Sequence, residues 1–217
     1  MRPIFITKQS TALDRDGIAL AQEPVAAGNL TLNGTLATGG VATVPTGQQI
    51  VGVYSAANIA ARVFTIYGTD DEGKAISEAV TGVNAGTVST SLNFKTVTRV
   101  AVDAATTADV EVGITGVSAT KPIPLDQHVS PFAVALFLQI ASGDTVNVTV
   151  QYTPDDVFDL TAVTTAGGIV WTAHPNLTGK AADADSNLAF PAAAVRLIVN
   201  SGTDPAELIV RQAGIWG

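Results

Sequence analysis

The chain has 217 residues, of which 47% are hydrophobic, 6% aromatic and 14% charged, and its formal net charge is −8. A chain of this length suits one large or two small domains. The negative charge and the scattered Lys and Arg argue against binding to nucleic acid or to an anionic membrane surface, and the absence of cysteine excludes disulfides and thiolate metal sites.

Residues 1–17 are predicted to form an N-terminal arm. An apolar start at Ile4-Phe5-Ile6 is followed by polar and charged residues with little periodicity. Termini are usually loose unless something ties them down, so this segment is either a disordered tail or an arm that pairs with a neighbour. The N-terminus has no apolar core of signal-peptide length. Ile4 and Phe5 are the candidate contacts of the arm.

Residues 18–117 are predicted to form a first β-rich module. Val, Thr and Gly are frequent, and alternating side chains mark short strands with tight turns between them. The expected strands are Leu30–Leu32, Ile50–Ser55, Arg62–Tyr67, Ala75–Val80, Thr90–Phe94, Val97–Val102 and Val110–Ile114.

One strand of the first module, Arg62–Tyr67, is apolar on both faces. We expect Val63, Thr65 and Tyr67 to face the core. Phe64 and Ile66 then cover another sheet, the second module or a neighbouring chain, and they are candidate assembly contacts. The acidic turn after this strand, Asp70–Gly73, predicts a hairpin, because Asp bonds its own backbone in turns.

Residues 118–127 are predicted to form a linker, since Pro122 and Pro124 cannot donate to a sheet. Residues 128–217 then form a second module. Its expected strands are Phe132–Ile140, Asn147–Tyr152, Val195–Asn200 and Glu207–Gln212. A loop insertion, Thr164–Asn187, holds Trp171, which is a candidate contact. Trp216, near the chain end, is another, although a terminal Trp more often packs on its own domain.

The two modules resemble each other. Laid without gaps on Ala135–Asp156, the stretch Ile50–Asp71 matches at a few identical positions and in its alternation, and Ala108–Val112 resembles Ala206–Val210 further on. Because both blocks keep their order, we interpret the chain as a degenerate internal duplication. The fold class predicted is all-β, with two tandem antiparallel β-sandwich modules that are jelly-roll-like or Ig-like. A small closed barrel is the alternative.

No catalytic or metal motif stands out. His174 precedes a proline and is predicted to be an ordinary surface histidine. Asp183-x-Asp185-x-Asn187 resembles the start of a calcium loop, but Leu188 stands where Gly is needed and Ala194 where the bidentate Glu belongs. No nucleophile elbow, phosphate loop or dinucleotide fingerprint is present. We therefore predict no catalytic residues, no metal and no cofactor, and a looser oxygen-ligand calcium site stays open.

A family resemblance lies in Arg62–Gly82, in Asn84–Thr87 and in Phe94–Thr98. The words "GTD-x-x-G", "I-S-E-x-V-T-G" and "F-K-T-V-T" in this order resemble a segment of tailed-bacteriophage virion proteins. Trp171–Pro175, Leu188–Pro191 and Ala194–Leu197 also resemble the end of such proteins. The resemblance covers about half of the chain and carries no binding residues to transfer.

This resemblance implies a non-enzymatic virion protein assembled in the bacterial host cytoplasm. We expect a decoration or cement protein of the head, bound to the major capsid protein or other virion proteins and to copies of itself, with a trimer favoured for a three-fold position. Tail, collar or head-fibre positions are alternatives, as is a module that recognises a host-surface carbohydrate. Neither nucleic acid nor membrane is an expected partner. Sparse charge fits a surface that meets other proteins.

Overall fold

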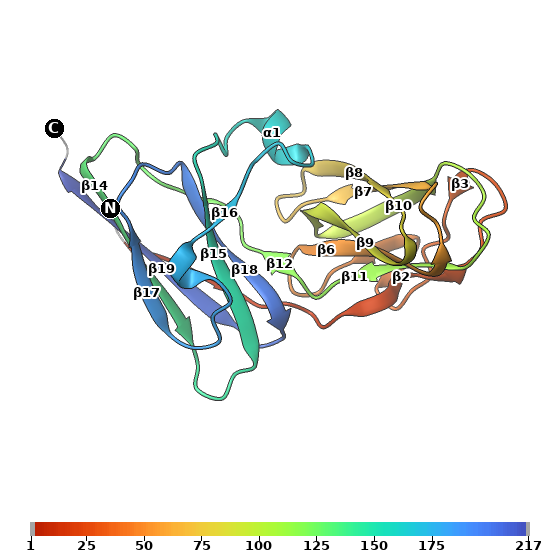
Figure 1. Cartoon of the computed structure of the whole chain (residues 1–217), viewed down its shortest axis with the longest axis horizontal. Helices are drawn as coiled ribbons and strands as arrows, with labels where there is room; N and C mark the ends of the chain where they lie inside the picture. Colours follow the sequence, from red (N-terminus) through yellow and green to blue (C-terminus); the bar gives the residue numbers. More distant parts are fainter. Residues whose placement is uncertain (1–2, 216–217) are drawn as a thin grey trace. The chain divides into compact units, whose positions relative to one another are not determined.

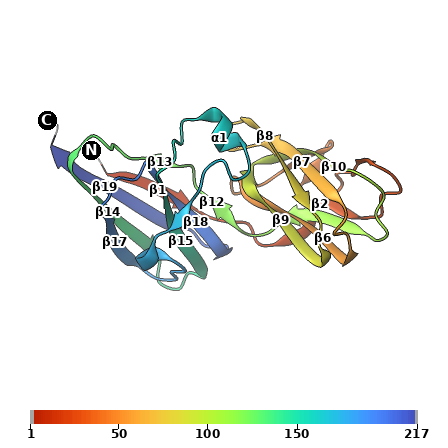
Figure 2. The ribbon, with the colours of Figure 1, turned by 45° about the horizontal axis from the view of Figure 1, so that its top comes forward.

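The structure, a computed structural model, describes residues 3–215. Trp216 therefore lies outside the described residues. The chain divides into two compact units. We name them module 1, which is Thr11–Val117 with Thr164–Ala166, and module 2, which is Met1–Ser10, Ser118–Val163 and Gly167–Gly217. Figures 1 and 2 show that each is built of β-strands.

Module 1 contains two antiparallel sheets. One has the strand order β2-β11-β6-β9, and the other has the order β4-β5-β10-β7-β8 with β3 also paired to β10. The strands are β2 (Asp14–Gln22), β3 (Gly28–Asn29), β4 (Ala37–Thr38), β5 (Val41–Thr43), β6 (Gln49–Asn58), β7 (Val63–Thr69), β8 (Ala75–Thr81), β9 (Asn84–Phe94), β10 (Thr96–Val102) and β11 (Val110–Ile114).

Module 2 also contains two antiparallel sheets, ordered β1-β19-β14-β17 and β12-β18-β15-β16, with β13 paired to β18. The strands are β1 (Ile4–Lys8), β12 (Ser118–Ala119), β13 (Ile123–Pro124), β14 (Ser130–Ile140), β15 (Val146–Thr153), β16 (Thr172–Ala173), β17 (Ala184–Leu188), β18 (Ala194–Gly202) and β19 (Ala206–Ile215). The segment between β15 and β17 also holds a short helix α1 (Leu160–Thr164) and a 3-10 turn η1 (Pro175–Leu177).

The two modules have the same topology. Each module can be numbered as eight strands in chain order, if the short strands β3–β5 of module 1 and β12–β13 of module 2 each count as strand two. In both modules one sheet then has the order 1-8-3-6 and the other sheet has the order 2-7-4-5. This is the strand order of a jelly roll, whereas an Ig-like sandwich pairs its strands as ABED and CFG. The predicted all-β class and antiparallel sandwiches are confirmed, and of the two sandwich types the strand order is the jelly roll.

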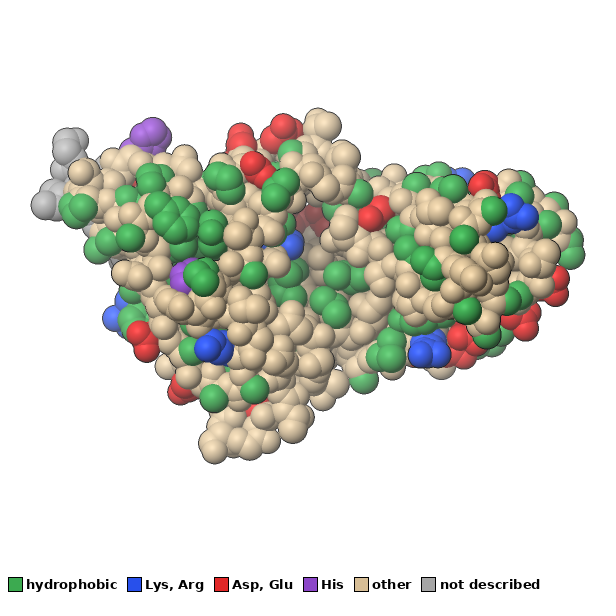
Figure 3. All heavy atoms as spheres, in the orientation of Figure 1, with side chains coloured by type: hydrophobic (Ala, Val, Ile, Leu, Met, Phe, Trp, Pro, Cys, Tyr) green, Lys and Arg blue, Asp and Glu red, His purple; other side chains and the backbone are tan. Residues whose placement is uncertain are grey.

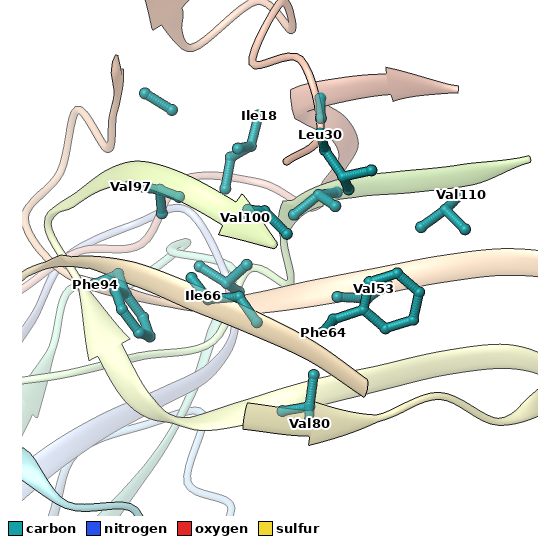
Figure 4. Close-up of a cluster of buried hydrophobic side chains, with 14 of the residues drawn as sticks. Ile18, Leu30, Val53, Phe64, Ile66, Val80, Phe94, Val97, Val100 and Val110 are labelled. Atoms are coloured by element: carbon teal, nitrogen blue, oxygen red, sulfur yellow. The ribbon is translucent and has the colours of Figure 1, made fainter. Parts of the chain in front are cut away.

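The core of module 1 lies between its two sheets (Figure 4). The central strand β7 points Phe64 and Ile66 inward, where both are fully buried among Val53, Val97 and Val100. Val63, Thr65 and Tyr67 are only half-buried. The predicted inward face of this strand was therefore wrong, because a one-residue error in register exchanges the two faces.

The core of module 2 follows the expected alternation more closely. Val146, Val148 and Val150 of β15 are buried, and they pack with Leu136 and Leu138 of β14. In the repeat alignment Leu136 and Leu138 fall on Val51 and Val53, which are equally buried in module 1. The alignment therefore holds for β6 and β14 and fails by one residue at β7, where Val63 falls on Val148.

The division of the chain differs from the predicted boundaries. The predicted arm, residues 1–17, is shared between the units: β1 pairs with β19 of module 2, and β2 begins at Asp14 in module 1. In the sequence, module 1 is thus inserted between the first and second strands of module 2. The predicted linker, residues 118–127, supplies β12 and β13, which pair with β18. The predicted strand Leu30–Leu32 is irregular, and the short strand before it ends at Asn29.

Candidate assembly surface

An apolar row crosses the outer face of one sheet of module 2. On β1 Phe5 is paired with Ile209 of β19, Ile209 is paired with Phe137 of β14, and Phe137 is paired with Asp185 of β17. Because paired residues point to the same side of a sheet, Phe5, Ile209 and Phe137 form one continuous line. We call these three residues the apolar row. Figure 2 shows the three strands that carry it, β1, β19 and β14, side by side.

The outer position of the row follows from alternation along each strand. The neighbours Ile4, Ile6, Leu136, Leu138, Leu208 and Val210 pack into the core of module 2, so the residues between them face outward. Phe5 is 58% exposed and Phe137 is 37% exposed, whereas Ile209, held between the two rings, is 7% exposed. Exposed rings of this size on one sheet face mark a contact surface, because covering them with a partner lowers the free energy of the complex.

Two opposite charges flank the row on β19. Arg211 lies two residues to one side of Ile209, and Glu207 lies two residues to the other side. The guanidinium of Arg211 lies 5.6 Å from the centroid of the Phe137 ring, within the range of a cation–π interaction. Arg211 is exposed and Glu207 is half-buried, so both charges border the apolar row.

The equivalent face of module 1 is different. Gly52 of β6 occupies the place of Phe137 in the repeat alignment, and the ring of Tyr54 lies over it, because a Cβ at Gly52 would meet the Tyr54 hydroxyl at 2.7 Å. Tyr54 is 5% exposed, and Arg15 of β2 stands 5.4 Å from its ring centroid. Burial raises the pKa of Tyr54, with Arg15 opposing the shift. An open apolar row is therefore a property of module 2.

A hollow of about 480 Å³ opens beside Tyr54 and is lined by polar groups that include Arg15, Asp109 and Glu111. It holds no activated nucleophile, since the Ser55 hydroxyl donates to the backbone oxygen of Asp109 at 2.8 Å. Its lining contains one cationic and two anionic side chains, Arg15, Asp109 and Glu111.

Trp171 lies against the outer face of the other sheet of module 2. The Arg196 guanidinium stands 4.2 Å from the Trp171 ring centroid, and its Nε donates to Gln151 at 2.9 Å. Burial lowers the pKa of Arg196 to about 9. One face of the indole is thus occupied by a side chain of its own module.

The histidine and acidic residues singled out in the sequence have structural contacts. His174 is buried, so its predicted surface position was wrong: Nδ1 accepts from the Asn176 amide and Nε2 lies 3.1 Å from the Asn187 oxygen. Asp183 accepts from the Ile140 amide at 2.7 Å, and Asp185 belongs to β17. Within residues 3–215 no group of three or more His, Cys, Asp or Glu side chains is placed to hold a metal.

The structure separates the predicted contact residues. Phe5 lies on the outer face, Ile4 turns toward the core of module 2, and Trp171 is half-buried against Arg196. Phe64 and Ile66 fill the core of module 1 and present no surface to another chain.

Sequence reasoning missed Phe137, Ile209 and Arg211. The available signal was alternation, since Phe137 stands between Leu136 and Leu138 and so points away from them.

Comparison with known proteins identifies no family for this chain. No family model matches the chain, and no curated protein is significantly similar to it. Among solved structures, the chain is similar to the major capsid protein P2 from Bacteriophage PM2, with 11% identity, a TM-score of 0.23 and coverage of 99% of this chain and 98% of that chain. That weak structural neighbour is a bacteriophage major capsid protein, and a TM-score of this size carries no argument about this chain. Among the described residues, no helix has the length and apolar character needed to cross a membrane.

Proposed function

We propose that this protein is a non-enzymatic structural component of a tailed-bacteriophage virion and that it decorates or cements the head. The observation that carries the proposal is the jelly roll built twice in one chain, a fold used by viral capsid domains and also by lectins. The sequence motifs that carry the resemblance to virion proteins lie on β7, β8 and β10 of module 1 and on the turns between them, so they belong to the framework of one jelly roll.

The proposed work is mechanical. A decoration protein binds because its rigid sheets present fixed surfaces to neighbouring subunits, and burial of apolar area then holds the contact. The apolar row of Phe5, Ile209 and Phe137 is the surface that fits this role. Figure 3 shows few charged side chains on the visible face, in keeping with a charged fraction of 14%. The same reasoning applies to a tail, collar or head-fibre position, in which only the virion partner differs.

The carbohydrate-binding alternative has less support. Sugar recognition uses exposed aromatic faces with polar groups beside them. Trp171, the candidate for that role, has one ring face against Arg196. No observation on the described residues favours this function over the structural one.

Virion particles provide the test. Peptide mass spectrometry of purified particles of the phage that encodes this chain should find the chain in a fixed ratio to the major capsid protein. Particles stripped of the chain should bind added wild-type protein in co-sedimentation, and the variant Phe137→Lys should bind more weakly. Phe158→Lys is the matched control, because Phe158 is 74% exposed and lies outside the row. Absence of the chain from the particles would refute the proposal.

A further inference from the structure

We propose that the apolar row is the contact between two copies of this chain, related by a two-fold axis that runs along the row. The inference deepens the proposed function, because it names the partner of the row, and it rests on that function only in treating the row as a contact surface. The occupant is identified from the arrangement of charges around Phe5, Ile209 and Phe137.

The two charges that flank Ile209 on β19 are self-complementary about that axis. Successive outward residues on a strand lie about 6.6 Å apart. Arg211 and Glu207 therefore lie at equal distances on opposite sides of Ile209. When two such faces meet about an axis along the row, each strand lies over the same strand of the second copy, with the rows on either side exchanged. Arg211 of one copy then meets Glu207 of the other, twice in the dimer.

The apolar residues also match under this operation. Phe5, Ile209 and Phe137 each face their own copy across the axis, and the rings cover each other. Asp185, paired with Phe137 on the edge strand β17, also faces its own copy, so one like-charge pair lies at the exposed end of the row, where water and salt screen it. The result is an apolar centre with an ion pair on each side, which is the usual anatomy of a specific interface.

The other face-to-face arrangement, with the axis along the strands, is unfavourable. It would place β1 over β17 and β19 over β14, because those strands have mirrored positions in the sheet. Phe5 would then cover Asp185, and Arg211 would cover Ala135. A charge covered by an apolar side chain loses hydration without gaining a partner.

The area of the sheet face that carries the row limits the affinity between the two copies. Two strands of about ten residues and two of five, spaced about 4.8 Å apart, give a flat area on the order of 500 Å² per copy. This lies at the low end for specific interfaces, so we expect a dissociation constant on the order of micromolar. A two-fold contact also closes on itself, which favours a dimer over the trimer expected from the sequence.

Sedimentation equilibrium of the full chain, over a range of concentrations, provides the first test. Wild type should fit a monomer–dimer equilibrium. Arg211→Glu and Glu207→Arg should each weaken dimerisation at least tenfold, since each places like charges together. The double variant Arg211→Glu/Glu207→Arg should restore it to within about threefold, because exchanging the signs recreates the pair. Glu72→Arg, in the exposed β7–β8 turn of module 1, is the charge-reversal control.

A cross-linking test measures the geometry. The chain has no cysteine, so Phe137→Cys introduces a single thiol, and that thiol faces its own copy only if the axis runs along the row. A short bis-maleimide should link Phe137→Cys into a dimer and leave Phe158→Cys monomeric. Sheets packed face to face lie about 10 Å apart, within reach of such a reagent.

Three results would overturn the inference: a wild-type chain that stays monomeric or forms trimers, a double variant as weak as the single ones, or equal cross-linking of both cysteine variants. Pairing through the free edge of β1 would give a dimer insensitive to both charge reversals, which also overturns it. Particle binding by a monomeric wild-type chain would leave the proposed function standing while this inference failed.

Discussion

Glu78 of β8 should be among the residues on which module 1 depends most. Glu78 is 8% exposed, and its carboxylate accepts four hydrogen bonds, from the Ser91 amide at 2.8 and 2.9 Å, the Ser91 hydroxyl at 3.0 Å and the Leu92 amide at 2.8 Å. The bonds join β8 of one sheet to β9 of the other. Replacing Glu78 by Ala removes the acceptor of two backbone amides, those of the exposed Ser91 and the half-buried Leu92.

The magnitude follows from those two amides. A buried donor left unsatisfied costs about 1–3 kcal/mol, and water can reach the Ser91 amide, so Glu78→Ala should lower the free energy of unfolding of module 1 by about 1–3 kcal/mol. Glu78→Gln keeps one acceptor oxygen and the side-chain shape, and should cost about half as much. Glu72→Ala, which removes a 3.8 Å surface ion pair with Lys74, should cost less than about 0.5 kcal/mol.

Hydrogen–deuterium exchange with urea unfolding separates the two modules. Exchange should rise across β8 and β9 in Glu78→Ala, while β14 and β15 of module 2 keep their wild-type protection. The urea midpoint of the module 1 peptides should fall with the slope unchanged. Equal stability of Glu78→Ala and Glu72→Ala would refute the reasoning, because the carboxylate would then contribute no more than an exposed one.

Three further substitutions test other parts of the fold. Burial raises the pKa of Tyr54 above 10.0, so above pH 10 the folded state keeps the phenol protonated while the unfolded chain ionises it. The free energy of unfolding of the wild type should therefore fall as the pH rises above 10. Tyr54→Phe should reduce this fall, as measured by urea titrations at pH 9 and pH 11. Gly68→Ala should cost at least about 2 kcal/mol in the same titration at neutral pH, because a Cβ at Gly68 would overlap the Thr96 carbonyl oxygen. His174→Ala loses two buried hydrogen bonds and should lower the melting temperature of module 2, at a cost of about 2 kcal/mol, whereas exposed His128→Ala should leave it unchanged.

Local patterns predicted most strands but not always their inward face. Alternation identified β11, Val110–Ile114, with its bounds, and the buried face of β15. It failed on β7, where Phe64 and Ile66 on one face compete with Val63 and Tyr67 on the other. Tyr67 remains half-buried on the outer face because Arg99 lies 3.7 Å from its ring centroid and covers it. A single strand carries no signal for such a neighbour from another strand.

The candidate surface could be predicted only in part, because it is assembled from distant strands. Phe5 was identified as a contact residue, but its neighbours in the row are Ile209 and Phe137. Phe137 lies within a continuous apolar run, Phe132–Ile140, which hides the alternation that would have shown its outward direction. Which strands pair is a property of the jelly roll as a whole, and no local pattern encodes it.

The strand order also determines when the proposed contact can exist. Module 1 is nearly contiguous, so it can fold as soon as Val117 has been synthesised, whereas module 2 needs β1 from the start of the described chain and β19 from its end. The pair Phe5–Ile209 joins residues about 200 positions apart, and this late closure is what places the first two members of the row together. A chain that lacks either β1 or β19 cannot present the row. If the row is the contact between copies, only chains that have been synthesised through β19 and have folded can pair, and chains that stop before β19 are excluded from the assembly by the fold itself.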